Sequence, residues 1–357
     1  MQRAANHEMV ILARQSRGHS QAALAKMLGI TPGTMSKIEH GISPLTADRV
    51  RDLADHLQYP DSLFYRPERV RGSDSICFHH RKRASMPARL LDRVEAEMHL
   101  SQLHVKRILG EVEIESDLEV PTLDPGEYGG PTEVARLVRA TWRLPSGPIS
   151  NMVQLVESAG AVVIIRDFGT RKLDAMSCWA KGVPPIFFLN SAMPTDRLRW
   201  SIAHELGHLV MHWTPPASDP EQEADEFARE LLLPDHETRP ALRTLTFTQL
   251  PALKTAWRVS MIALVKAAAT RNALPPNKTK SLYVQISRRG WRTEEPYALE
   301  PESPATLEAA VTVHLHEHGY STDELARIVD LHPKEFRATY LPNVPDPEDP
   351  KRHLRAV

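Results

Sequence analysis

The spacing of apolar positions predicts a mainly helical chain. Residues 7–66 read as a compact all-helical unit. Residues 86–115 carry apolar side chains at spacings of three, four and seven, which predicts one long helix. Two amphipathic helical segments follow at 132–142 and 147–160, after a stretch rich in turn-forming residues at 117–131.

A small sheet is predicted next. Runs of β-branched and other apolar residues predict strands at 161–168, 174–180 and 185–190. A helix around His204 follows, and then a second helix from about Pro220 to Leu233. Together these elements indicate an α+β fold, mainly α with a small β-sheet.

The pattern after Pro234 is weaker. Residues 245–274 and 304–340 have helical spacing, whereas 281–291 could form a hairpin or a wing. The polar and basic stretch 71–85 could be a linker or a short strand with a charged edge. We therefore expect five regions. They are an N-terminal domain (1–70), a linker with a connecting helix (71–130), a sheet-containing domain (131–240), a helical C-terminal domain (241–345) and a flexible tail (346–357).

Composition narrows the class of protein. The chain has 357 residues and a formal net charge of −1, so contact with nucleic acid would need a local basic patch. Its two cysteines, Cys77 and Cys178, exclude a disulfide framework and favour a cytoplasmic location. No apolar run reaches about 18 residues and the N-terminus does not resemble a signal peptide, so no membrane partner is expected.

Residues 19–41 have the spacing of a helix-turn-helix. Ser20 can cap a first helix, Gly29 can form the tight turn, and Thr31 can cap a second helix that begins with Pro32. Gly41 stands where that second helix should end. A third helix at 46–57 would cover the core, giving a domain of the five-helix type.

In such a unit the second helix enters the major groove of double-stranded DNA with its N-terminal residues. The candidate groove contacts are Thr31, Gly33, Thr34 and Lys37. Gln21, at the start of the preceding helix, is placed to contact a backbone phosphate. The alternative is a helix-turn-helix used only for packing or dimerisation.

The segment 199–212 contains the motif H-E-x-x-H. Its histidines, His204 and His208, are four residues apart, so they share one helix face and can bind one Zn²⁺ ion. Glu205 beside them could take a proton from metal-bound water. An amphipathic helix with solvated His and Glu would show the same short motif, but apolar neighbours and the small Gly207 favour a site next to a core.

A catalytic zinc site needs a third protein ligand. His212 lies on the same helix face, but three histidines spread over two turns drift in angle. The helix at 221–234 is the better source. We expect Glu223, at the edge of its buried face, to be the ligand, with Glu221 in reserve.

Two family resemblances follow from these motifs. Residues 7–66 resemble the Cro/repressor-like (XRE) family at the turn and cap positions, including Gln21, Gly29 and Gly41. HELGHLVMH followed by E-x-E-A-D-x-F-A-x-E-L-L-L-P resembles the ImmA/IrrE metallopeptidases, and the likeness covers about residues 75–300. That resemblance implies a gluzincin-like core, zinc held by two histidines and a glutamate, and a protein substrate of the repressor type. The XRE resemblance implies operator DNA binding, usually as dimers.

Two functions fit these expectations. The first is a DNA-binding regulator with a zinc-dependent endopeptidase domain, in which Mn²⁺ could replace Zn²⁺. The second is a transcription factor whose peptidase-like domain senses a metal or ligand without proteolysis. Two minor features remain: residues 174–190 could align a substrate backbone or be core strands, and 319–336 imitates helix-turn-helix spacing but reads as an acidic packing unit.

Overall fold

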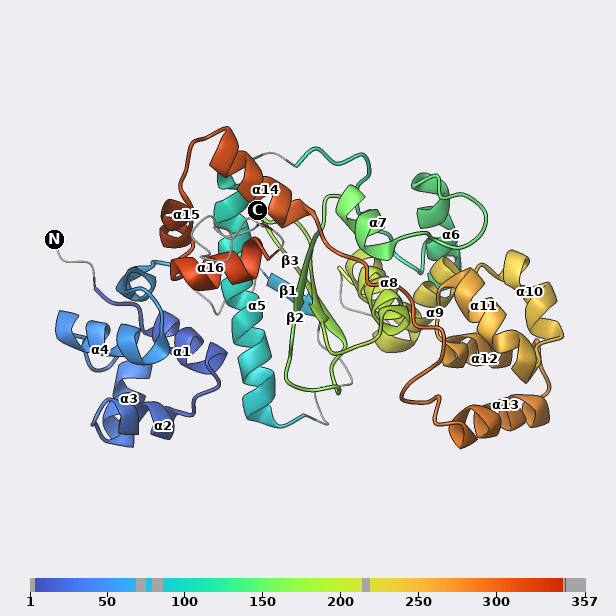
Figure 1. The fold of residues 1–357 in the computed structure, drawn as a ribbon, viewed down its shortest axis with the longest axis horizontal. Helices are drawn as coiled ribbons and strands as arrows, with labels where there is room; N and C mark the ends of the chain where they lie inside the picture. The colour runs from blue at the N-terminus through green and yellow to red at the C-terminus, as the bar shows by residue number, and fades with distance from the viewer. Residues whose placement is uncertain are drawn as a thin grey trace, which may run out of the picture. The chain divides into compact units, whose positions relative to one another are not determined.

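The computed structural model describes residues 4–68, 75–78, 86–112, 114–213, 219–342 and 344. The chain divides into two compact units. Unit 1 comprises Met1–Gly72, Pro87–Ile114 and Ala305–Val357, and unit 2 comprises Ser73–Met86 and Glu115–Pro304. Figure 1 labels the α-helices of both units and strands β1 to β3. The expected tail 346–357 lies outside the described residues.

Unit 1 begins with four α-helices and a short 3-10 helix, which confirms the all-helical N-terminal expectation. Ser20 and Thr31 cap the two central helices through their hydroxyls, and Gly29 turns the chain between them at φ +62°. These elements are α1 (His7–Ser16), α2 (Gln21–Met27), α3 (Pro32–Glu39), α4 (Ala47–Leu57) and η1 (Asp61–Tyr65).

The rest of unit 1 comes from distant parts of the chain. The long helix predicted at 86–115 is present as α5 (Ala88–Ile108) followed by η3 (Leu109–Glu111), and α5 packs on α1. Helices α14 (Thr306–His316), α15 (Thr322–Ile328) and α16 (Pro333–Tyr340) complete the unit.

Helices α15 and α16 reproduce the spacing of α2 and α3. Asp330 takes the place of Gly29 in the turn and adopts the same left-handed conformation, at φ +56°. Its carboxylate is fully buried and accepts hydrogen bonds from Ser62, Arg66 and Arg107. These contacts fix the pair against the rest of unit 1, as expected of a packing unit.

Unit 2 is built around a mixed four-stranded sheet. The strands are β1 (Ser75–Phe78), β2 (Val162–Arg166), β3 (Ala175–Ala180) and β4 (Ile186–Asn190), in the order β1-β3-β4-β2. β2 and β4 are parallel, and the other pairs are antiparallel. The three predicted strands are confirmed, and 75–78 resolves the choice between linker and strand for those residues.

The sheet order argues against one expectation. β4 pairs with β2 over Ile186–Asn190 and with β3 over Ile186–Leu189, and β3 pairs in turn with β1 over Ser177–Ala180, so little of either strand is left to align a substrate backbone. Phe187 and Leu189 of β4 are fully buried. β3 and β4 are thus the inner strands of the sheet, with β1 and β2 at its edges, which favours the core-strand alternative.

Helices come both before and after these strands along the chain. α6 (Pro131–Thr141) and α7 (Met152–Ser158) come before β2, and α8 (Thr195–Met211) and α9 (Pro220–Leu232) follow β4, as expected. The remaining elements of unit 2 are α10 (Asp235–Arg243), η4 (Phe247–Gln249), α11 (Leu250–Trp257), α12 (Met261–Thr270) and α13 (Pro276–Arg288).

Two expectations about the C-terminal half differ from the structure. Residues 281–288 are helical rather than a hairpin or wing, because Leu282 and Ile286 are four residues apart and bury on one helix face. The expected domain 241–345 is divided, since residues up to Pro304 belong to unit 2 and those from Ala305 to unit 1. Among the described helices, none has the length and apolar composition needed to cross a membrane.

Candidate metal centre

The histidines of the H-E-x-x-H motif lie one turn apart on α8, and the Nε2 atoms of both rings point toward the same place. His204 Nε2 and His208 Nε2 are 3.1 Å apart. The carboxylate of Glu221, from the first turn of α9, lies 3.3 Å from His208 Nε2 and 3.7 Å from His204 Nε2. Two imidazoles and one carboxylate thus converge, each with a ligand atom within 4.8 Å of the others.

The opposite ring nitrogens are held by other side chains. His204 Nδ1 is 3.1 Å from Asp225 Oδ1, and the other oxygen of Asp225 accepts a hydrogen bond from Lys266 at 2.7 Å. His208 Nδ1 is 2.8 Å from His212 Nδ1. Because a second hydrogen bond fixes the orientation of a ligating histidine, these contacts suit both rings to hold a cation through Nε2.

Burial and charge set the protonation of this group. Burial and, to a smaller extent, the charge of neighbouring His204 lower the pKa of His208 to about 4, because both make a positive charge on its ring less favourable. For His204 burial acts in the same direction, but the hydrogen bond with Asp225 and the negative charges of Glu205, Asp225 and Glu221 together outweigh it and raise the pKa. The carboxyl of Asp225 is held well below its usual pKa: burial opposes this, and its bonds to His204 and Lys266 prevail.

Glu223 does not join the histidine pair, which differs from the sequence-based choice. Its carboxylate lies 3.0 Å from His212 Nε2, one turn beyond His208. Successive residues rotate by about 100° around a helix, so side chains two apart leave it in different directions and reach different histidines here. Glu221, named as the reserve, is the residue that the structure places beside His204 and His208.

Glu205 lies next to the cluster and is held by the sheet. Its side chain is buried, and Ser177 Oγ of β3 donates a hydrogen bond to its Oε2 at 2.6 Å. This bond fixes one carboxylate oxygen.

The close packing of α8 on α9 depends on Gly207. A Cβ at this position would lie 3.0 Å from Phe227 Cδ1 and 3.3 Å from the Cα of Ala224. The two helices can therefore approach closely only because residue 207 has no side chain, as its place in the motif suggested. This approach sets how near Glu221 comes to the histidines.

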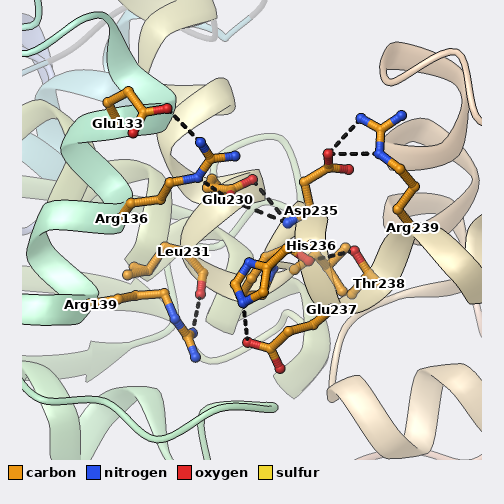
Figure 2. Close-up of polar contacts among 12 residues, drawn as sticks. Glu133, Arg136, Arg139, Glu230, Leu231, Asp235, His236, Glu237, Thr238 and Arg239 are labelled. Atoms are coloured by element: carbon orange, nitrogen blue, oxygen red, sulfur yellow. Dashed lines mark hydrogen bonds and ion pairs between the residues drawn. The ribbon is translucent and has the colours of Figure 1, made fainter.

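The far end of α9 is fixed by polar contacts with α6 and α10 (Figure 2). Arg136 of α6 forms an ion pair with Glu230 at 2.9 Å, and Arg139 donates to the carbonyl of Leu231 at 2.7 Å. The backbone N–H of Asp235 also lies 3.2 Å from Glu230 Oε1. These contacts hold α9 in place at the end opposite Glu221.

Three residues of this centre were not expected from the sequence: Ser177, Asp225 and Lys266. A signal existed for one of them. Glu221 and Asp225 are four residues apart, the same spacing as His204 and His208, so both carboxylates face the same way. Ser177 and Lys266 reach the site from β3 and α12, which only the folded chain brings near.

The candidate DNA contacts lie around the start of α3 in unit 1. Thr31, Gly33 and Lys37 are exposed and Thr34 is half-buried. Thr31 also caps the helix by accepting from the backbone N–H of Thr34 at 3.1 Å. Gln21 differs, because its amide donates to Glu39 at 2.9 Å.

Glu39 also accepts a hydrogen bond from Arg14, so this part of Gln21 belongs to a network inside the domain. Its contact with phosphate stays a prediction. The same holds for the groove contacts of the other four residues.

Comparison with known proteins matches two parts of the chain. A helix-turn-helix family matches residues 10–64, and the IrrE N-terminal-like domain family matches residues 156–268. No curated protein and no solved structure matches the chain. The second match runs from α7 into α12, so it includes His204 and the side chains grouped around it, whereas α6 lies outside the matched residues. The chain therefore carries an XRE-type helix-turn-helix domain followed by a peptidase-type domain of the ImmA/IrrE family.

Proposed function

We propose that unit 2 is a zinc-dependent endopeptidase and that unit 1 binds operator DNA. The observation that carries the first part is the convergence of His204 Nε2, His208 Nε2 and the Glu221 carboxylate. This is the open, three-ligand set of catalytic zinc sites. Glu205, one residue from the first ligand, would be the general base.

The donor set fits zinc better than a harder ion. Imidazole nitrogen suits Zn²⁺, whereas Mn²⁺ prefers oxygen ligands, so Mn²⁺ is the second choice. When bound, zinc supplies a Lewis acid that makes water a nucleophile near neutral pH. His204 and His208 would hold the cation through Nε2, and Glu221 would supply the third bond and a negative charge.

The residues around the ligands would orient and tune them. Asp225 fixes the His204 ring, and Lys266 neutralises the charge of that carboxylate. Glu205 would accept a proton from the attacking water and pass it to the leaving amine. Ser177 restrains the Glu205 carboxylate, so it is a positioning residue rather than a catalytic one.

The substrate class rests on the family resemblance. We propose that the endopeptidase cleaves a repressor-type protein and so controls gene expression, with unit 1 bound to double-stranded operator DNA as a homodimer of the chain. The chain itself is a further candidate substrate, cut within 67–85. Cleavage inside Ser75–Phe78 would first require release of β1 from β3.

The test is Glu205→Gln in the full chain, assayed against purified XRE-type repressors encoded nearby and against the chain itself. The amide keeps the size of the side chain but cannot accept a proton. We expect bound zinc to be retained and cleavage to fall by about 10²–10⁴-fold. Glu294→Gln, at an exposed position of unit 2, is the matched control and should cleave as wild type does.

Two results would count against this function. Cleavage by Glu205→Gln at the wild-type rate would remove Glu205 from the mechanism. No cleavage by zinc-loaded or manganese-loaded wild type across the panel would favour the alternative, a transcription factor whose peptidase-like domain senses metal or a ligand.

A further inference from the structure

Unit 1 contains a second group of two histidines and a glutamate. His314 lies in the last turn of α14, and His318 follows two residues after that helix ends. Glu111 is the last residue of η3. The ligand atoms of these three side chains all lie within 4.8 Å of one another.

The ring of His314 is oriented by the backbone. Its Nε2 lies 2.6 Å from the carbonyl oxygen of Ile108, and a carbonyl only accepts, so Nε2 carries the proton. The neutral ring then has its lone pair on Nδ1. A backbone carbonyl that binds the other ring nitrogen is the usual support of a metal-binding histidine.

The lone pair of His314 faces a second imidazole nitrogen. His314 Nδ1 and His318 Nδ1 are 3.1 Å apart. Two nitrogens bound to one tetrahedral zinc at about 2.0–2.1 Å would be roughly 3.4 Å apart. A small opening of this pair would therefore admit the cation between them.

Glu111 supplies an anionic ligand and is itself supported. Tyr320 Oη donates a hydrogen bond to Glu111 Oε2 at 3.2 Å. His314 is buried, whereas Glu111 and His318 are exposed, which leaves the group accessible to ions and water from solvent.

We propose that His314, His318 and Glu111 form a second metal site, which takes Zn²⁺ or a similar late first-row divalent cation. Two imidazoles and one carboxylate favour such ions over Mg²⁺ or Ca²⁺, which prefer oxygen ligands. The ion would join the end of η3 to the segment between α14 and α15. It would therefore tie together parts of unit 1 that are about 200 residues apart in the chain.

The test measures zinc bound per chain in full-length protein without a histidine tag, by elemental analysis after equilibration with Zn²⁺. We expect two equivalents in wild type and one in His318→Ala. His316→Ala is the matched control, because His316 is exposed at the end of α14. This variant should keep two equivalents of zinc. In a His204→Ala/His208→Ala background we expect one equivalent, lost when His318→Ala is added.

The background variants separate this site from the one on α8. If the His204→Ala/His208→Ala protein keeps its helical circular dichroism but binds no zinc, the second site does not exist. An unchanged zinc content in His318→Ala would also overturn it. Loss of one equivalent in both His316→Ala and His318→Ala would show that these residues act through unit 1 structure and not as ligands.

Discussion

At the residue scale, the two carboxylates at the start of α9 divide their roles by spacing. Glu221 lies with His204 and His208, and Glu223 lies with His212. The second pair supports the first, because His212 also contacts His208 through its other ring nitrogen. The proposed ligand and a supporting contact thus come from neighbouring positions on one helix.

This division predicts unequal effects of two similar substitutions. Glu221→Ala removes a ligand, so we expect zinc affinity to fall sharply and cleavage to recover in part with excess metal. Glu223→Ala leaves all three ligands and removes only a partner of His212, so affinity should fall by about 10–100-fold at most. Competition with a chromophoric chelator measures both. Stronger loss with Glu223→Ala than with Glu221→Ala would reverse the assignment.

The sequence could predict the members of this centre that share one helix. Spacing of four places His204 and His208 on one face, and Glu205 follows from the motif. The third proposed ligand was harder to predict from the sequence, because the periodicity of buried positions places Glu223 closer to the core than Glu221. What decides between the two glutamates is the rotation of α9 about its axis, which its packing on Gly207 fixes.

At the element scale, the approach of α8 and α9 controls the metal centre. Gly207→Ala would place a methyl group against Phe227 and the backbone of Ala224. We expect a loss of about 1–3 kcal/mol in the free energy of unfolding, as for other overpacked cores. Zinc affinity should fall as well, because Glu221 moves with α9.

Denaturant unfolding and metal competition test this prediction together. Gly33→Ala is the control, since a Cβ there would meet only Thr31 Oγ1, at an ordinary contact distance of 3.9 Å, and Gly33 lies in neither metal centre. Unchanged stability and unchanged zinc affinity in Gly207→Ala would show that α9 is not held by this contact.

Prediction of the elements succeeded where local signals agreed. Ser20, Gly29 and Thr31 mark caps and a turn, and α2 and α3 begin and end where they indicate. Residues 281–288 suggested a hairpin or wing because their β-branched and aromatic residues suit a strand. In the structure, tertiary packing buries Leu282 and Ile286 on one face of a helix. Packing of this kind has no signal in a short window of sequence.

At the scale of the whole molecule, the division into units follows contacts that join distant segments. Arg17 pairs with Glu335, and Arg66 and Arg107 pair with Asp330, so the last helices belong with the first. Hydrophobic periodicity finds α15 and α16 but cannot tell which domain they complete. This is why 241–345 was expected to be one domain and is two parts.

The same contacts determine how DNA binding should be tested. Deleting residues 1–66 would remove Arg66 and Arg17, which pair with Asp330 and Glu335, so loss of binding would also follow from misfolding. Point substitutions at the exposed start of α3 avoid this. Lys37→Ala removes one positive charge. Among the hydrogen bonds and ion pairs of the described residues, none involves the Lys37 side chain, so the substitution should leave the fold intact.

If Lys37 contacts a phosphate, its loss should weaken binding to all sequences alike and lower the slope of log affinity against log salt by about one. Thr34→Ala should instead change the preference among operator sequences, because it removes a group from the groove-facing turn. Lys334→Ala is the matched control: residue 334 stands in α16 where Gly33 stands in α3, and it should bind DNA as wild type does. Fluorescence anisotropy across a salt series measures all three proteins. An equal slope for wild type and Lys37→Ala would exclude the phosphate contact, and a reduced slope for Lys334→Ala would make α16 a second DNA-binding helix.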